Sequence, residues 1–310
     1  CERWMTCLRA VDDLPASGAP RGHETSEAVT ADPRLGFYGP GSQMWRINRE
    51  AVLLGAGPAS LLWQIAHPLV AEGVAAHSRY ESDPFGRLRR TLTTTLDLVF
   101  GDGARAERAV RRLDVIHGRV HGDVRDAVAR TATAAERYDA TDPEQLLWVQ
   151  ATLVLMAVRA YEAWVGPVSP VERERMWQEA RRVGIRLGIE RSTSPPSWPA
   201  LEAWVERQMR PDGPVKVTPT ARRLSHSLIR PPLPLIPGPL VELAATPGLQ
   251  LLPEPIRAGF GITPGRPRAL SARALGLGLK AWVRVLPADW RALPQARAAE
   301  RRCRRHEVAP

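Results

Sequence analysis

Two histidines, His117 and His121, stand four residues apart in the segment HGRVHG. On a helix this spacing puts both imidazoles on about one face, which suits a metal ion. Zinc would need a third ligand and a catalytic acid, and Gly118 stands where an HExxH site has its glutamate. A di-iron site would need paired Glu-x-x-His units, which only Asp114 approaches, whereas haem needs a single axial imidazole. Three interpretations stay open: a haem ligand, a divalent-metal pair, and two ordinary histidines.

A second polar group lies in GRLRRTLTTT, where Arg87, Arg90 and Thr91 are spaced by three and four residues. This spacing predicts that they share one helix face. Two guanidinium groups and a hydroxyl there could bind haem propionates or stabilise negative charge on oxygen. The alternative is a solvated charged face.

His67 directly precedes Pro68, so we expect it to lie at a polar break where one helix ends and another begins. From this position alone we interpret it as a structural histidine rather than a ligand. The nearby segment LLGAGPAS resembles a dinucleotide fingerprint through Gly55 and Gly57. A Rossmann turn needs a preceding strand and a third glycine where Ser60 stands. We therefore expect the two glycines to allow close helix packing.

Helical spacing of apolar residues dominates the chain from about Trp45 onward. It predicts helices over 50–66, 68–77, 84–100 and 104–133. No strand alternation of convincing length occurs before residue 210. After that point the proline-rich stretch 211–267 predicts an extended segment wrapped on the helical body, with short helices near Leu240, Pro255 and Ala269.

The strongest helix start is TDPEQLLWV, with Thr141 as N-cap, Pro143 in the first turn and Glu144 completing a capping box. The helix that it opens, 143–164, is apolar nearly all round, so we expect it at the centre of the fold. Ser169 starts the next helix by the same logic. We predict an all-α protein with a flexible arm over 1–40, a single helical domain over 41–300 and a basic tail over 301–310.

Composition excludes a disordered or collagen-like chain, since 44% of the 310 residues are hydrophobic. The net charge is +10, and only Lys216 and Lys280 among the 43 cations are lysines. The arginines are spread through the chain, which favours solvated helix surfaces over a nucleic-acid groove. The uncharged stretch 51–71 contains glycine and proline, so we expect a buried helix there rather than a membrane span.

The three cysteines, Cys1, Cys7 and Cys303, stand at the chain ends and indicate neither a disulfide framework nor a cysteine-rich zinc site. The chain begins with Cys1 and has no apolar segment in its first thirty residues, so we expect a truncated or processed start and a cytoplasmic protein. A lipid-anchored or exported protein is the alternative. Peripheral membrane contact and the oligomeric state stay open.

Several motifs occur together, in an order and spacing that resemble the MpaB-like oxygenase family, which includes the bacterial latex-clearing proteins. The resemblance covers about residues 45–294, and its combination of AHP, R-x-x-R-T, H-x-x-V-x-G and Y-x-A-x-D-P is specific. The segments that carry it are REAVLLGAGPASLLWQIAHPLVAEGVAAHS (49–78), DPFGRLRRTLTTTLDLVFGD (83–102), HGRVHG (117–122), YDATDPEQLLWVQATL (138–153) and LLPEPIRAGFGI (251–262).

The resemblance implies an all-helical fold with a globin-like core around haem b, and oxygenase chemistry. It implies His117 as the axial iron ligand, with His121 as an extra or alternative ligand, and Arg87 and Thr91 as distal catalytic residues. Glu72 lies near the position of a carboxylate base in the rubber-cleaving members.

Two positions depart from the family. Arg90 replaces a lysine of the rubber-cleaving members. Because a guanidinium stays protonated, it cannot ligate iron, and we assign it with His67 to haem binding instead. Gln150 stands where relatives often have histidine. The resulting hypothesis is a haem b-dependent oxygenase acting with dioxygen on a small apolar, isoprenoid-like substrate. A divalent-metal protein and a non-catalytic helical protein are the alternatives.

Overall fold

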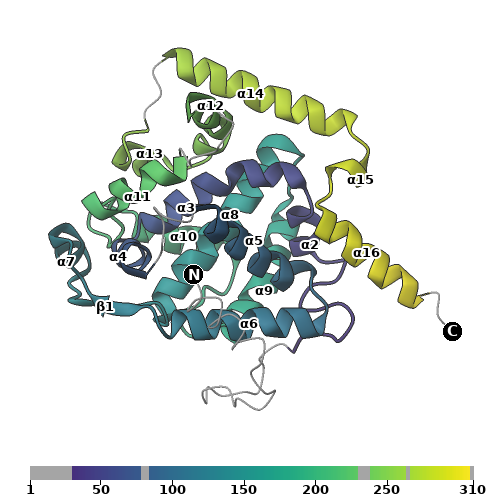
Figure 1. Cartoon of the computed structure of the whole chain (residues 1–310), viewed down its shortest axis with the longest axis horizontal. Coiled ribbons are helices and arrows are strands. Elements are labelled where there is room, and N and C mark those ends of the chain that lie inside the picture. Colours follow the sequence, from purple (N-terminus) through teal and green to yellow (C-terminus); the bar gives the residue numbers. More distant parts are fainter. Residues whose placement is uncertain (1–29, 78–83, 230–237, 263–265, 308–310) are drawn as a thin grey trace.

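The computed structural model describes residues 30–77, 84–229, 238–262 and 266–307, with side chains left undescribed at 84–91, 238–240, 266–268 and 305–307. The predicted all-α class is confirmed, with one small sheet added (Figure 1). A globin-like arrangement of the core stays a prediction. The elements are α2 (Gln43–Asn48), η1 (Ala51–Ala56), α3 (Gly57–Ile65), α4 (Pro68–His77), α5 (Pro84–Phe100), α6 (Gly103–His117), β1 (His121–Asp123), α7 (Ala127–Thr133), β2 (Arg137–Asp139), α8 (Pro143–Trp164), α9 (Pro170–Arg186), α10 (Trp198–Gln208), α11 (Pro219–Ile229), α12 (Gly238–Leu249), α13 (Glu254–Gly259), α14 (Arg266–Val285), α15 (Ala288–Arg291) and α16 (Pro294–Glu307).

Helix α8 lies at the centre of the fold, as predicted from its apolar sequence (Figure 1). It contacts η1, α3, α9, α10 and α14. Trp63, Trp148 and Trp177 are almost completely buried around it. Within the described residues α8 is the single helix long and apolar enough to cross a membrane, and its packing here is that of a core helix.

The start of α8 differs from the prediction by one residue. Asp142, not Thr141, is the N-cap, and its carboxylate accepts hydrogen bonds from the backbone N–H groups of Glu144 and Gln145 at 2.9 and 3.1 Å. Thr141 instead donates its hydroxyl to Asp139 at 2.7 Å. The capping box predicted at Ser169 for α9 is confirmed.

The predicted helix 104–133 is wrong, because α6 ends at His117. The chain turns at Gly118 and forms β1, which pairs antiparallel with β2, and α7 follows as a separate helix. The strands of the β1–β2 hairpin are three residues each, too short to show as alternation in the sequence. Glycine at 118 and 122 and the capping carboxylate of Asp126 compete locally with helix continuation.

Helices occur near Leu240, Pro255 and Ala269 as predicted, and they are α12, α13 and the longer α14. The rest of the proline-rich stretch was expected to be extended, but its described part contains a further helix. Helix α11 begins at Pro219, since proline is tolerated in the first turn of a helix. Helix α12 packs on η1 and α3, where an added Cβ at Gly248 would lie 2.4 Å from the carbonyl oxygen of Gly55. Helix α14 then crosses over α8 and α12 on the outside of the molecule (Figure 1).

The segment around Gly55 and Gly57 is helical, so rejection of a dinucleotide fingerprint was right. Close packing holds for Gly55, whose added Cβ would lie 3.7 Å from the Trp164 ring, but nothing lies within 4 Å of one at Gly57. The predicted flexible arm falls mostly outside the described residues. Within the described part, Tyr38 is buried in a second core cluster that joins α2, α5 and α16.

Candidate functional site

A carboxylate, an imidazole and a phenol meet where α4 packs against the β1–β2 hairpin. Glu72 is buried, and its Oε2 accepts a hydrogen bond from the backbone N–H of Arg125 at 2.8 Å. His77, at the exposed end of α4, has its Nε2 3.1 Å from Oη of Tyr138 and 3.3 Å from the carbonyl oxygen of His121. We call Glu72, His77 and Tyr138 the α4–hairpin cluster.

Two glycines make room for the Tyr138 ring between helix and hairpin. An added Cβ at Gly122 would lie 2.7 Å from the Tyr138 hydroxyl, and one at Gly73 would lie 3.6 Å from the same ring. Val120, which directly precedes β1, packs against the ring, and Tyr138 itself is buried. The ring position therefore depends on residues from three separate segments of the chain.

The electrostatics of this cluster keep the phenol neutral. Burial raises the pKa of Tyr138, and the negative charge of Glu72 raises it further. A neutral phenol can both donate and accept a hydrogen bond. The cluster thus contains a buried carboxylate, a protonated hydroxyl and an exposed imidazole, which are side chains of the kinds that act as general acids and bases.

His117 is the last residue of α6, and burial lowers the pKa of its imidazole. The neutral form that this favours has a free lone pair, as an iron ligand requires. Helices α5 and α6 are joined by the short turn at 101–102 and contact each other. His117 therefore lies toward the same end of this helical pair as the first half of α5, which carries Arg87, Arg90 and Thr91; their side chains are outside the described part.

Helix α6 ends at His117, so His121 lies outside this helix. It is the first residue of β1 and its side chain is exposed. The prediction that the two imidazoles share a helix face is therefore wrong. The described residues contain no group of three or more His, Cys, Asp or Glu side chains that could hold a metal ion.

His67 lies between α3 and α4, at the break that its sequence position predicted. Its side chain is only 7% exposed, and burial lowers its pKa to about 4. Its Nδ1 has no hydrogen-bond partner, and its ring centroid is 6.0 Å from that of Trp148. An unpartnered buried nitrogen on a neutral imidazole fits a group that needs one imidazole ligand, as haem does.

Gln150 has a structural role. Its Nε2 donates to the carbonyl oxygen of Ala180 at 2.8 Å, and an added Cβ at Gly184 would collide with its amide. The side chain therefore joins α8 to α9, away from the α4–hairpin cluster.

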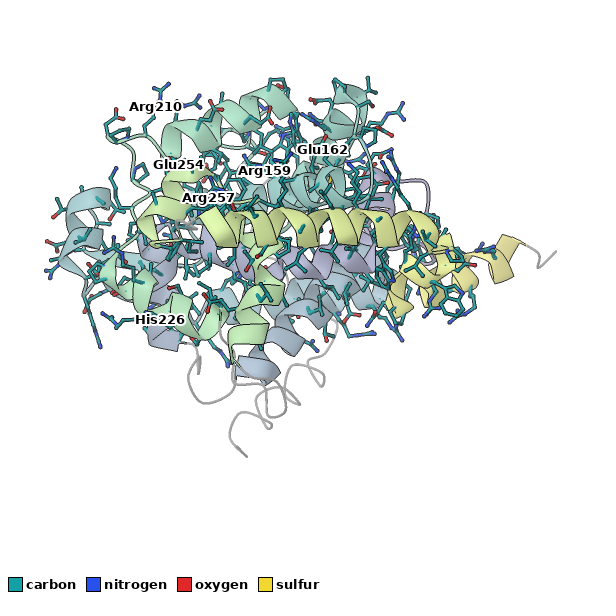
Figure 2. The ribbon with its side chains drawn as sticks, turned by 90° about the horizontal axis from the view of Figure 1, so that it is seen from above. Arg159, Glu162, Arg210, His226, Glu254 and Arg257 are labelled. Atoms are coloured by element: carbon teal, nitrogen blue, oxygen red, sulfur yellow. The ribbon has the colours of Figure 1, made fainter. Side chains whose placement is uncertain are left out.

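Sequence reasoning missed His77 and Tyr138 as functional candidates, although Tyr138 opens the Y-x-A-x-D-P motif. Sequence reasoning also did not single out two arginines with a structural role, Arg159 of α8 and Arg257 of α13 (Figure 2). Arg159 lies over the Trp63 ring at 4.7 Å and donates to Leu251, while Arg257 donates to Gln250. Both arginines fasten the turn after α12, so we interpret them as structural.

A pocket of about 330 Å³ on α9 does not coincide with any of these groups. The carboxylate of Glu179, which lines the pocket, accepts hydrogen bonds from the backbone N–H groups of Gln43 and Met44. It therefore satisfies the first backbone donors of α2. Its lining side chains are Glu174, Arg175, Gln178, Glu179 and Arg182.

Residues 44–288 match the family described as ER-bound oxygenase mpaB/B'/Rubber oxygenase, catalytic domain. The match spans most of the chain, which therefore belongs to this family of oxygenase catalytic domains. Two uncharacterized proteins, from Mycobacterium bovis and Mycobacterium tuberculosis, are each 30% identical to it over 206 residues, covering 63% of this chain and 75% of the relative. No solved structure matches it significantly.

Proposed function

We propose that this chain is a haem b-dependent oxygenase that acts with dioxygen on a small apolar organic substrate, isoprenoid-like in character. The observation that carries the proposal is the α4–hairpin cluster, a buried carboxylate beside a neutral phenol in a chain of an oxygenase family. The hairpin that holds this cluster directly follows His117, whose imidazole is kept neutral by burial.

His117 is our choice for the residue that would bind the haem iron, and His67 is the second imidazole that burial keeps neutral. Arg90 is our choice for a propionate partner, since its fork fits a carboxylate and its charge is permanent. When bound, haem supplies the dioxygen chemistry that amino-acid side chains lack.

The chain's own groups supply proton transfer and charge stabilisation. Glu72 would accept a proton from the substrate, while the Tyr138 hydroxyl keeps its own proton and interacts with His77. His77 connects the cluster to solvent. Arg87 and Thr91 would donate hydrogen bonds to oxygen atoms that gain negative charge, and preorganised donors of this kind contribute a few kcal/mol.

The apolar character of the substrate is inferred from the walls. Leu69, Val120 and Val124 pack around Tyr138. Apolar surroundings of this kind favour an apolar molecule over a charged one.

The decisive experiment is an absorption spectrum of the haem-loaded protein and of three matched variants, His117→Ala, His121→Ala and His67→Ala. We expect His117→Ala to lose the Soret band and His121→Ala to keep it. Loss in His67→Ala alone would move the ligand to the α3–α4 break. An unchanged band in all three, or no band in the parent protein, would overturn the haem proposal.

A second measurement separates the cofactor from the proton-transferring residues. Glu72→Gln keeps the size and the hydrogen-bonding oxygen of the side chain, so the Soret band should remain while substrate-dependent oxygen uptake falls by about 10². Uptake equal to that of the parent protein would remove Glu72 from the mechanism.

A further inference from the structure

Helix α14 presents apolar side chains on both of its sides. Its inner side packs on α8 and α12, where Ala272 and Val283 are 3% and 1% exposed. On its opposite side Leu270, Leu277 and Val285 are 68%, 62% and 83% exposed. A surface helix of a globular protein normally has polar residues on its outward side, so this outer face needs a partner.

The exposed apolar residues form one stripe, because they follow helical spacing. Successive members are three or four residues apart, and small alanines fill the positions between the large side chains. Both views show α14 running along the outside of the molecule (Figures 1 and 2), and every member of the stripe is exposed. We call the stripe the outer face of α14, and its members are Leu270, Ala274, Leu277, Ala281 and Val285.

Cationic and aromatic side chains border the outer face. Arg273, Lys280 and Arg284 follow one edge of the stripe, at spacings of seven and four. Trp282, 58% exposed, lies at the other edge, and Trp290 of α15, 76% exposed, continues the surface beyond the helix. Leucine and tryptophan beside a row of Lys and Arg are typical of helices that lie in the interface of a membrane.

We propose that the outer face of α14, continued by Trp290, docks on an anionic lipid membrane. Leu270, Leu277 and Val285 enter the boundary between headgroups and acyl chains, and the cationic edge meets lipid phosphates. Charge complementarity selects this occupant. The α14 sequence contains no acidic residue, and the chain carries a net charge of +10. A second copy of the chain would bring that positive charge against itself, whereas an anionic bilayer attracts it.

Helix α6, at the opposite side of the molecule, supplies a control (Figure 1). It also exposes three arginines at helical spacing, Arg105, Arg108 and Arg111. Tryptophan is absent from α6, and Ile116 is its one exposed large apolar side chain, at 38%. Each helix thus carries a row of three cations, and of the two only α14 combines such a row with an exposed apolar stripe.

The test is flotation of the full chain with vesicles of phosphatidylcholine alone and of phosphatidylcholine mixed with phosphatidylglycerol. We expect binding to the anionic vesicles that weakens as salt is raised. The triple variant Arg273→Gln, Lys280→Gln, Arg284→Gln should bind about a hundredfold more weakly, since each cation near the surface contributes on the order of 1 kcal/mol. The control Arg105→Gln, Arg108→Gln, Arg111→Gln removes the same charge from α6 and should bind like the parent.

The apolar stripe is tested by Leu277→Ser combined with Trp282→Ser. These side chains are solvent-exposed, so the variant should keep the parent's circular dichroism. It should lose most of the vesicle binding, and with it the blue shift of tryptophan emission that binding causes in the parent.

Three results would overturn the proposal. The first is no binding to anionic vesicles at low salt. The second is equally weakened vesicle binding in the α6 and α14 triple variants, which would indicate that net positive charge, and not the outer face of α14, causes the binding. The third is a dimer in sedimentation that Leu277→Ser with Trp282→Ser converts to monomer while vesicle binding is unchanged, which would assign the outer face to a second copy.

Discussion

The core around α8 and the α4–hairpin cluster are held in different ways. Around α8, large apolar side chains such as Trp63 and Trp148 are almost completely buried, and helices from all parts of the chain contribute. In the cluster, polar groups are positioned by glycines and by single hydrogen bonds to a short hairpin. We therefore expect the core to be sensitive to loss of apolar volume, and the cluster to be sensitive to any change that moves its polar groups.

The largest expected effect is on the core. Trp148→Ala should lower the free energy of unfolding by about 3–5 kcal/mol, because it leaves a cavity and frees the carbonyl oxygen of Gln64, to which the indole donates at 3.0 Å. Urea unfolding measures this. Trp290→Ala, at a site 76% exposed, is the matched control and should change stability by less than about 0.5 kcal/mol. Equal effects would mean that α8 is not the stabilising centre.

A pH effect of somewhat smaller size arises at His67, where the core meets the start of α4. Its pKa is about 4 in the folded chain, below the ordinary 6.5, because burial disfavours the charged ring. The unfolded chain therefore binds a proton more readily than the folded chain. The free energy of unfolding has its full value above pH 6.5, and the part that depends on a neutral His67 is lost as the pH falls to 4. The whole change corresponds to about 3 kcal/mol.

His67→Phe isolates the effect of that ring. The variant keeps an aromatic ring against Trp148 but cannot be protonated, so the loss of stability between pH 6.5 and 4 should be smaller than in the parent. Chemical unfolding across this range gives the difference. Parallel pH profiles for the two proteins would show that His67 is solvated or paired.

In the cluster, Gly122→Ala should lower the free energy of unfolding by about 1–2 kcal/mol. It should also strongly reduce the rate of oxygen uptake, since the new methyl group displaces the Tyr138 hydroxyl from His77. Gly57→Ala is the control, because nothing lies within 4 Å of an added Cβ there and its φ of −54° is helical. It should be neutral or stabilising by a few tenths of a kcal/mol. Retained activity in Gly122→Ala would separate the hairpin from the function.

The same contrast explains which features the sequence predicts. Helix α8 was located by its local capping signal and its apolar sequence, both of which act within one segment. The α4–hairpin cluster was not predictable in this way, because Gly122 and Tyr138 acquire their roles only when β1 pairs with β2. The apolar residues of α6 continue with helical spacing past His117, which predicts a longer helix. Two glycines and the N-cap at Asp126 end that helix instead. Glu72 was proposed from family resemblance, whereas its bond to the Arg125 backbone needs the fold.

The smallest predicted effect concerns the connection between the two regions, where β2 ends and α8 begins. Asp142→Ala removes the carboxylate that accepts from Glu144 and Gln145, and should cost about 1 kcal/mol. Thr141→Ala removes a hydroxyl that bonds only within the turn, so its cost should be a few tenths of a kcal/mol. Urea unfolding of the two variants ranks them. Because the cap stabilises α8 rather than the hairpin, Asp142→Ala should leave oxygen uptake unchanged at temperatures where the protein is folded. A larger loss in Thr141→Ala would return the N-cap to the residue that the sequence pattern predicted, and a loss of uptake in Asp142→Ala would show that the core and the α4–hairpin cluster are energetically coupled through this turn.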